Sequence, residues 1–332
     1  MLEFDLKFYL GIVLFVAAGV GLLLNVSVAA PVFRLAFAKD KSTIYVISSV
    51  NILNDIVHLM ISTFYLAPTI ILHSFWFSEN RNGHFSLFIS FIFMVLWYIG
   101  NIAQIVMAVN RWCVICLHKH SFFTRRNLII IFAITIICAI VKSYIIQYVF
   151  PCCAFIVDHT VLSYSYFQID NLPNYTDQSD IPLNALSSII PVLCYSHIYY
   201  EIVKASRSIS PTMRTELQKR RGRQELSYAM QFCLISFFYT FSWIMFRVFP
   251  LIFDGRQIEW FILTALCHVC NCSANAFVYI MFNKEVQRQL STNKLLKFSG
   301  MANVIETHSS EHHTTQSRVH TIPIPTARQH TS

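Results

Sequence analysis

The sequence predicts an all-α membrane protein built from seven transmembrane helices. The composition is 55% hydrophobic and 13% charged, which leaves too little polar surface to coat a water-soluble protein of 332 residues. Seven apolar segments each provide the roughly 20 helical residues that cross a bilayer core of about 30 Å. Lys and Arg gather in alternate loops between these segments, as expected for a chain that crosses a membrane repeatedly.

The seven predicted spans differ in how strictly they exclude charge. Four contain no Lys, Arg, Asp or Glu, and they are residues 8–33, 83–110, 181–200 and 260–283. Three contain one such residue each, namely Asp55 in 43–78, Lys142 in 127–157 and Arg247 in 226–252. Runs of this length favour helices, because barrel strands are shorter and alternate in polarity. We therefore expect a membrane domain over residues 1–298, followed by a tail over 299–332.

The distribution of positive charge predicts the orientation of the chain. The net charge is +8, and 20 of the 25 Lys and Arg residues lie in the loops after the first, third and fifth spans or in the C-terminal tail. By the positive-inside rule the N-terminus is outside and the C-terminus cytoplasmic. The same alternation argues against binding of nucleic acid. The sequon Asn174-Tyr175-Thr176 falls in an outer loop, so we expect glycosylated Asn174 and a plasma-membrane protein.

Two adjacent cysteines stand out at the outer end of the fourth predicted span. Cys152 and Cys153 follow Pro151, on the side assigned to the oxidising exterior. The first outer loop and the start of the third span contain no Cys, so a disulfide from this pair to the third helix is unavailable. The pair is therefore free, bonded internally or bonded to another molecule.

Three motifs flank the cytoplasmic ends of the predicted spans. They are QIVMAVNRWCVI at 104–115, RRGRQE at 220–225, and NAFVY at 275–279 followed by FNKE at 282–285. Together they resemble rhodopsin-like G-protein-coupled receptors, and most closely the nematode serpentine chemoreceptors of class x, over residues 8–298. The resemblance implies a chemosensory receptor that binds an external small molecule or peptide and activates a heterotrimeric G protein. Sensory cilia are a candidate location.

The resemblance also assigns roles at the cytoplasmic end. It implies that Arg111 faces the G-protein cavity, with Tyr199 and Tyr279 nearby. Asn110 replaces the acidic residue that most rhodopsin-like receptors carry, so Glu225 is a candidate partner for Arg111 in the resting state. The alternative is that the Arg anchors the helix at the interface and the two Tyr residues belong to an aromatic belt.

A midplane polar cluster is expected around Asp55. Asp55 lies 12 residues after Thr43, or about 18 Å along a helix, near the centre of the bilayer. An ionisable residue costs roughly 2.5–3.5 kcal/mol there, so it should face the bundle. The resemblance brings it near Asn25 and Asn275, and implies that Asn275 also takes part in activation. The cluster either binds a sodium ion or waters, or contains a protonated Asp55.

The outer half of the bundle is expected to hold the ligand. Six candidate lining residues are Met94, Trp97, Asn101, Lys142, Arg247 and His268. The first three share one helix face with Arg111, and the last three are polar groups in or near the outer half, where cations favour an anionic or acceptor-bearing ligand. The alternatives are ordinary packing for any of them, snorkelling for the Lys, and pairing of the Arg with Asp254 or Glu259.

The cytoplasmic segments carry further expectations. Residues 284–298 are expected to form an amphipathic juxtamembrane helix, and the basic run 219–223 is expected to meet anionic lipid, a G protein or both. Residues 307–332 contain ten Ser or Thr and five His, which predicts a disordered tail. That tail either binds an arrestin-type partner after phosphorylation or has no specific role.

A seven-span transporter or ion-channel subunit is the competing interpretation. Transporters often contain internal repeats and helices broken by Gly or Pro. The chain has no evident repeat and only 8 Gly and 10 Pro. No metal-spacing, nucleophile–base or phosphate-loop motif is found, so we expect neither an enzyme nor a cofactor.

Overall fold

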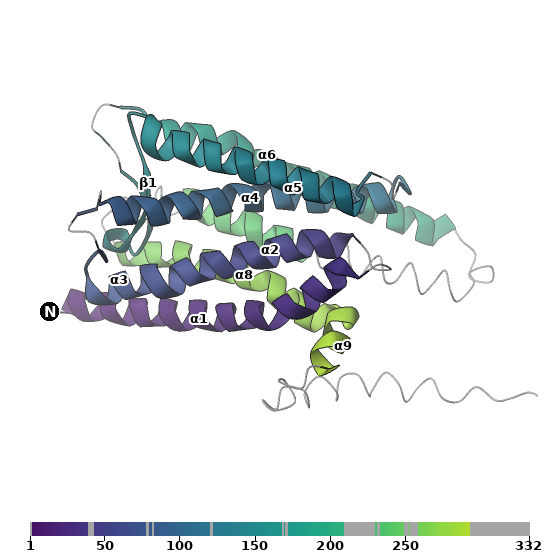
Figure 1. Ribbon diagram of the computed structural model, residues 1–332, viewed down its shortest axis with the longest axis horizontal. Coiled ribbons are helices and arrows are strands. Elements are labelled where there is room, and N and C mark those ends of the chain that lie inside the picture. The colour runs from purple at the N-terminus through teal and green to yellow at the C-terminus, as the bar shows by residue number, and fades with distance from the viewer. Residues whose placement is uncertain are drawn as a thin grey trace, which may run out of the picture. The chain divides into compact units, whose positions relative to one another are not determined.

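The computed structural model of the chain describes residues 2–38, 43–77, 80–81, 83–119, 122–167, 169, 172–208, 230, 233–248, 252 and 258–292. The described residues are mostly helical (Figure 1). In chain order the long helices are α1 (Leu2–Phe37), α2 (Ile44–Ile61) continued by α3 (Ala67–Leu72), α4 (His84–Ile115), α5 (Arg125–Tyr144), α6 (Tyr175–Ser208), an unlabelled helix Cys233–Val248 and α8 (Ile262–Phe282). A short helix, α9 (Lys284–Thr292), follows.

Six helical segments are long and apolar enough to cross a membrane. They are Leu6–Phe37, Ile44–Leu72, His84–Ile115, Arg125–Val149, Tyr175–Lys204 and Ile258–Phe282. The sixth predicted span, 226–252, is described as the shorter apolar helix Cys233–Val248, and the residues immediately flanking it lie outside the described part. The predicted fold class, a helical membrane bundle, is confirmed.

Local signals explain where several helices begin and end. Thr124 caps α5, because its hydroxyl accepts a hydrogen bond from the Asn127 backbone N–H at 3.2 Å. Asn174 does the same for α6, accepting from the Asp177 backbone N–H at 2.9 Å. The second span changes to a π-helical turn at Ser62–Leu66 and ends at His73, whose positive φ of 52° terminates the helix.

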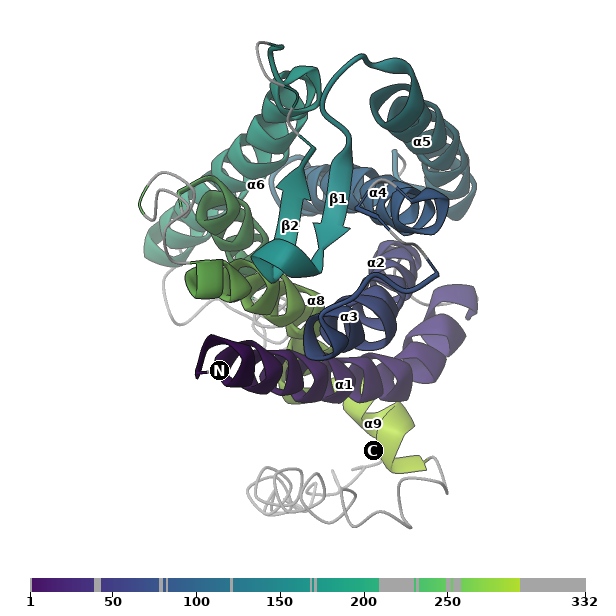
Figure 2. The ribbon, with the colours of Figure 1, turned by 90° about the vertical axis from the view of Figure 1, so that its left-hand side faces the viewer.

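The central helix of the bundle is α4, which contacts α2, α5 and α6. On the other side, α1 packs against α2, α3 and α8. Figure 2, which looks along the bundle, shows these helices arranged around a hairpin that lies across one end. A second unit of the chain begins at Lys284, and its described part is α9. The predicted positions 293–298 of that juxtamembrane helix and the whole tail lie outside the described residues.

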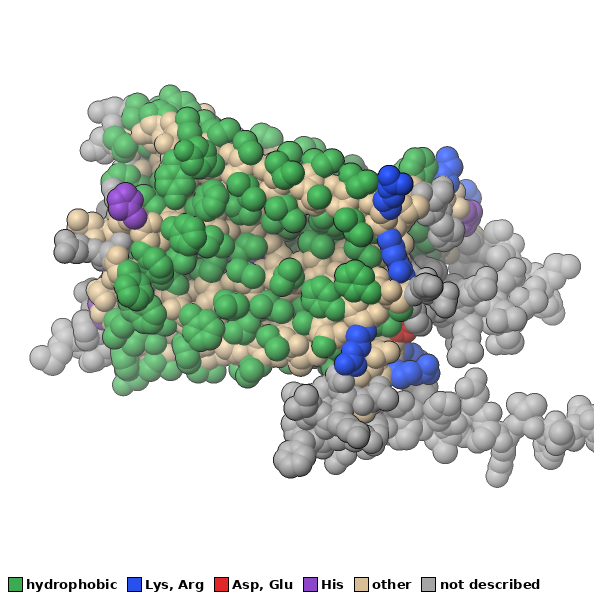
Figure 3. All heavy atoms as spheres, viewed as in Figure 1, with side chains coloured by type: hydrophobic (Ala, Val, Ile, Leu, Met, Phe, Trp, Pro, Cys, Tyr) green, Lys and Arg blue, Asp and Glu red, His purple; other side chains and the backbone are tan. Residues whose placement is uncertain are grey.

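The surface of the bundle is divided as a membrane requires. Hydrophobic side chains cover most of the length of the face in Figure 3, and Lys and Arg gather at one end. The C-terminal end of α1 lies next to the N-terminal end of α5, where the Arg125 guanidinium donates a hydrogen bond to the carbonyl oxygen of Ala38. Arg34 in the last turn of α1 and Arg126 add to the positive charge of those two helix ends.

The hairpin was not predicted from the sequence. We expected residues 127–157 to form one helix, but the helical segment ends at Val149 and the chain returns as strands β1 (Phe155–Asp158) and β2 (Ser163–Tyr166). The strands pair antiparallel, from Phe155 opposite Tyr166 to Asp158 opposite Ser163. Pro151 explains the break, because proline disfavours helical geometry in the residue before it, and Phe150 is extended with ψ 138°.

Noncovalent contacts hold the hairpin against the bundle, since no disulfide to the third transmembrane helix is available. The Ser90 hydroxyl of α4 accepts a hydrogen bond from the Val157 backbone N–H at 3.0 Å. Asp158 is fully buried and lies 2.6 Å from the Arg81 guanidinium, while the Ser165 hydroxyl donates to it at 3.0 Å. Cys152 and Cys153 are bonded to each other, which is one of the three alternatives left open by the sequence.

We predict that Asp158→Ala destabilises the hairpin. The substitution removes the buried acceptor of several hydrogen bonds and should cost about 1–3 kcal/mol. Thermal melting of the purified chain and hydrogen exchange of residues 155–166 should both report the loss. Glu201→Ala is the matched control, because its 3.8 Å pair with Lys204 is on the surface and should contribute about 0–1 kcal/mol. Equal effects of the two substitutions would contradict the anchoring role of Asp158.

Candidate functional site

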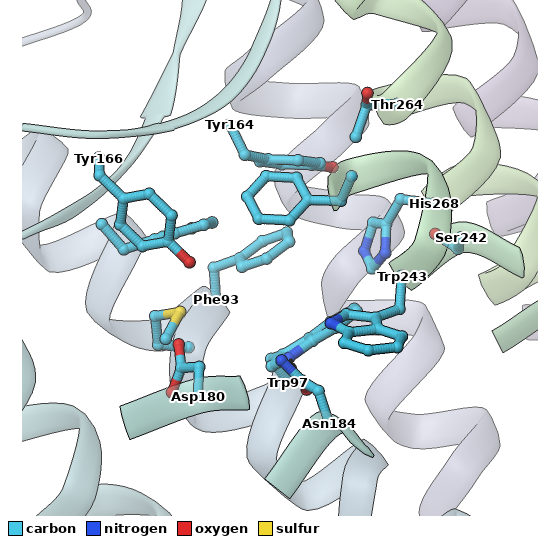
Figure 4. A pocket seen from close by; sticks show the side chains of 13 residues that line it. Phe93, Trp97, Tyr164, Tyr166, Asp180, Asn184, Ser242, Trp243, Thr264 and His268 are labelled. Atoms are coloured by element: carbon cyan, nitrogen blue, oxygen red, sulfur yellow. Dashed lines mark hydrogen bonds between the residues drawn. The ribbon is translucent and has the colours of Figure 1, made fainter. Parts of the chain in front are cut away.

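An aromatic pocket lies beneath the hairpin, among α4, α6, α8 and the helix Cys233–Val248. Its wall includes the aromatic residues Phe93, Trp97, Phe155, Tyr164, Tyr166, Trp243 and Phe246, together with Met94, Asp180, Asn184, Ser242, Thr264 and His268 (Figure 4). The cavity has a volume of about 40 Å³, enough for roughly three water molecules. The pocket is therefore small and mostly apolar, and hairpin residues form part of its wall.

Three of the six predicted pocket residues line this cavity. Met94 and His268 are 2% and 4% exposed, and Trp97 donates through its indole N–H to the Asn184 side-chain oxygen at 3.0 Å. Asn101 lies one turn further along α4 and is fully buried outside the pocket wall. It nevertheless shares the Asn184 oxygen, to which its own amide donates at 3.1 Å.

Asn101 belongs to a polar network that joins three helices. The hydroxyls of Ser187 and Tyr239 both donate to its side-chain oxygen, the former at 2.8 Å. One turn nearer the cytoplasmic end of α4, the Ser236 hydroxyl donates to Gln104 at 3.2 Å. The face of α4 predicted from helical spacing therefore connects the pocket floor to α6 and to the helix Cys233–Val248.

The two cations of the outer half are already paired. The Lys142 ammonium lies 3.1 Å from Asp180 and 4.1 Å from the centre of the Tyr98 ring, whose hydroxyl donates to the same carboxylate. The Arg247 guanidinium forms an ion pair with Asp177.

These contacts correct the expectation that Lys142 and Arg247 bring unpaired positive charge to a ligand. Neither residue lines the aromatic pocket, and each has a carboxylate from the first two turns of α6. Asp177 also takes the place of the partners considered for Arg247 from the sequence. An unpaired charge is too costly at this depth, so each cation is neutralised locally.

His268 connects the aromatic pocket to a second cavity below it. Its ring lies 5.1 Å from Phe93 and 4.7 Å from His58, measured between ring centres. Trp97 and His268 line both cavities. The second cavity has a volume of about 20 Å³, room for about one water molecule, and Asp55 lines it.

Asp55 and Asn275 form the centre of the midplane cluster. The Asn275 amide donates to the Asp55 carboxylate at 2.5 Å, and both side chains are buried. Asn25 lies against the same turn of α8, donating to the Cys272 carbonyl oxygen at 3.1 Å, but it does not line the cavity. The side-chain oxygens of Asn54 and Asn275 have no hydrogen-bond partner among the described residues. These carboxylate and amide oxygens are suitable ligands for a hard cation such as sodium, and equally for a water.

The cytoplasmic end of α4 places Asn110 and Arg111 inside the bundle, at 1% and 2% exposure. Arg111 lies within electrostatic range of the phenols of Tyr195 and Tyr279. The Tyr279 hydroxyl donates to Ser48 of α2 at 2.5 Å. The buried Asn110 amide has no hydrogen-bond partner in the part of the chain that the structure describes.

The placement of Tyr199 differs from expectation. Tyr199 is 68% exposed on the outer surface of α6, whereas Tyr195, one turn earlier, is buried at 8% exposure. Tyr195 therefore occupies the position beside Arg111 that the resemblance gave to Tyr199. Glu225, the candidate resting-state partner of the arginine, lies outside the described residues.

Ionisation of the hairpin side chains is also set by burial. Burial and the nearby carboxylates of Asp180 and Asp177 raise the pKa of the Tyr166 phenol well above its usual value, so the phenol stays protonated. Burial lowers the pKa of His159, whose ring centre lies 4.2 Å from that of Phe75. The hairpin therefore adds neutral aromatic groups to the outer end of the bundle.

Sequence reasoning missed Tyr195, the two carboxylates of α6 and the hairpin aromatics. Asp177 and Asp180 are spaced by three residues just before a charge-free run, and this spacing places them on one helix face. That signal was available in the sequence. Nothing local indicated that Phe155 and Tyr164 would fold back over the bundle.

The comparisons with known proteins agree with this architecture. The solved structure of squid rhodopsin superposes with a TM-score of 0.68 over 95% of this chain and 93% of the rhodopsin chain, at 14% sequence identity. This similarity shows the fold of a rhodopsin-like seven-helix receptor. The family profile described as "Serpentine type 7TM GPCR chemoreceptor Srx" matches residues 15–283. The search of curated proteins found no match.

The chain therefore belongs to the Srx family of serpentine G-protein-coupled chemoreceptors. It is a multi-pass membrane protein, and ligand binding and G-protein coupling are general properties of this class. Family and fold together favour the receptor over the transporter or ion-channel alternative, and both are those of receptors rather than enzymes.

Proposed function

We propose that the chain detects an external small molecule in the aromatic pocket and transmits binding along α4 to Arg111. The observation that carries the proposal is the series of buried polar contacts on one face of that helix. The side chains of Trp97 and Asn101 both donate a hydrogen bond to the Asn184 oxygen. The Tyr239 hydroxyl donates to Asn101, and the Ser236 hydroxyl donates to Gln104. Each contact joins α4 to a neighbouring helix, so a ligand that shifts these helices changes the network along its length.

At the cytoplasmic end, Arg111 is the proposed contact for a heterotrimeric G protein. In this structure the arginine is buried, near Tyr195 and Tyr279. Outward movement of the helix Cys233–Val248 would give the guanidinium access to a partner. Asn110 and Asn275, which are both buried, would then adjust with α4 and α8. Glu225 remains a proposed resting-state partner.

The remaining partners and the location are proposed from the sequence. We place the receptor in the plasma membrane, and sensory cilia are the candidate site because the family is chemosensory. The amphipathic segment 284–298 and the basic run 219–223 are proposed to contact anionic lipid. The Ser/Thr-rich tail is proposed to bind an arrestin after phosphorylation. The proposed receptor domain comprises residues 1–298, and the proposed cytoplasmic tail comprises residues 299–332.

Replacement of Arg111 tests the coupling site. We expect Arg111→Ala to abolish ligand-stimulated nucleotide exchange while surface expression and ligand affinity without G protein stay near wild type. Exchange on purified G protein, with the chain in lipid nanodiscs, is the measurement. Exchange at the wild-type rate in this variant would remove Arg111 from the mechanism.

Tyr195 and Tyr199 provide a matched pair for the same test. Tyr195→Phe removes a buried hydroxyl near Arg111 and should change the exchange rate, whereas Tyr199→Phe alters an exposed surface position and should not. Indistinguishable rates in the two variants would contradict the assignment of Tyr195.

Asp55 is the proposed ligand for a sodium ion, together with the side-chain oxygens of Asn54 and Asn275. We expect sodium to lower basal nucleotide exchange in the wild type, because an ion at this site would stabilise the resting arrangement of α2 and α8. Asp55→Asn should remove that dependence while keeping the side-chain size. The comparison uses sodium and choline at equal ionic strength. If basal nucleotide exchange is the same in sodium and in choline for both proteins, the sodium site is contradicted and Asp55 has only its hydrogen bond to Asn275.

The proposed orientation is tested at Asn174. With the N-terminus outside, enzymatic removal of glycans should increase the gel mobility of the wild type but not of Asn174→Gln. Thr176 of the sequon is buried in the first turn of α6, so glycosylation of Asn174 must occur before that turn packs against the rest of the chain. A C-terminal tag that is labelled on intact cells would contradict the orientation.

A further inference from the structure

Among the described residues, those that line the aromatic pocket offer no unpaired charge to a ligand. Asp180 is the ionisable carboxylate in its wall, and one of its oxygens already receives the Tyr98 hydroxyl and the Lys142 ammonium. The nearby Arg247 is paired with Asp177. An anionic or cationic ligand would have to compete with one of these ion pairs and leave a buried charge uncompensated.

The pocket does contain hydrogen-bonding groups that lack partners. Among the described residues, the indole N–H of Trp243 and the hydroxyl of Thr264 are buried without a hydrogen-bond partner, and Thr264 is only 4% exposed. The indole N–H of Trp97 shows the contrast, because it is satisfied by Asn184 at 3.0 Å. A tryptophan N–H can only donate, so the group that would satisfy Trp243 is a hydrogen-bond acceptor.

The position of Trp243 suits contact with a ligand. Figure 4 shows the nitrogen edge of its indole facing the side chains of Trp97 and His268, and all three residues line the same cavity. Trp243 lies on the helix Cys233–Val248, whereas Thr264 and His268 lie on α8. An acceptor bound at Trp243 would therefore contact a helix whose movement the proposed function requires.

The rest of the wall selects for size and apolar character. The space in this structure holds roughly three water molecules, and aromatic rings from the hairpin, α4 and the helix Cys233–Val248 surround it. Those rings favour a compact apolar body, which they can contact by stacking or edge packing.

We propose that the ligand is a small, uncharged, mostly apolar molecule with a carbonyl or hydroxyl oxygen, and that this oxygen accepts a hydrogen bond from the indole N–H of Trp243. The proposal rests on the proposed function for the choice of pocket, but its chemistry comes from the pocket's own groups. Of the two ligand types expected from Lys142 and Arg247, anionic or acceptor-bearing, the proposal keeps the acceptor and excludes the anion.

Binding of cyclopentanone to the full chain in lipid nanodiscs tests the proposal. Cyclopentane, cyclopentanecarboxylate and cyclopentylamine are the matched apolar, anionic and cationic probes. Ligand-induced thermal stabilisation and quenching of tryptophan fluorescence report binding, and nucleotide exchange on G protein is recorded separately. We expect the ketone to bind more tightly than the other three probes.

Trp243→Phe isolates the hydrogen bond, because it keeps an aromatic ring and removes the N–H. It should weaken ketone binding roughly three- to tenfold, as expected for one neutral hydrogen bond, without weakening cyclopentane. Thr264→Val should have a smaller effect in the same direction. Thr135→Val is the control on α5, where the hydroxyl donates to the Ile131 carbonyl oxygen away from the pocket.

The outcomes separate the ligand from the proposed function. Ketone binding that depends on Trp243 but never stimulates exchange would support the ligand class and contradict the function. Stronger binding of the carboxylate or the amine, equal binding of ketone and cyclopentane, failure of all four probes to bind, or a ketone affinity unchanged in Trp243→Phe would overturn the ligand class.

Discussion

The pairing of polar side chains inside an apolar bundle is the constraint on which the rest of the structure depends. A membrane-spanning helix has little water around it to satisfy a buried carboxylate or amide, so a partner on another helix stabilises such a group. Asp55 meets Asn275 and Asn101 meets Asn184 in this way. Each contact stabilises one particular helix packing and also links parts of the chain that a ligand could move together.

The same constraint explains the outer end of the bundle. Lys142 and Arg247 are retained near the membrane because Asp180 and Asp177 neutralise them. The hairpin, which has no disulfide to α4, is anchored instead through the buried Asp158 and the Ser90 hydroxyl. The result is a pocket lined by aromatic rings, with no unpaired charge among its described residues. Trp97 and His268 line both this pocket and the cavity at Asp55.

Those features that depend on local composition could be predicted from the sequence. The apolar runs predicted the spans, and the ionisable Asp55 within one of them predicted a side chain directed into the bundle; in the structure Asp55 is buried beside Asn275. Features that depend on distant contacts could not be predicted. The partner of Arg247 is 70 residues away. Phe155 lies near the end of the apolar run 127–157, which has the composition of a single helix although Pro151 breaks it. Tyr195 and Tyr199 lie four residues apart on nearly the same face of α6, so helical spacing alone could not predict that neighbouring segments bury the first and leave the second exposed.

Reciprocal coupling between the pocket and the cytoplasmic end is the central claim of this account. The most direct measurement is the affinity of the wild-type chain in nanodiscs for an agonist found by cell screening, with and without an excess of nucleotide-free G protein. Linkage requires that a G protein favoured by the agonist also tighten agonist binding, typically by about 5- to 150-fold. A tighter affinity in that range is the predicted result. An affinity that does not change when the G protein is bound would contradict the claim.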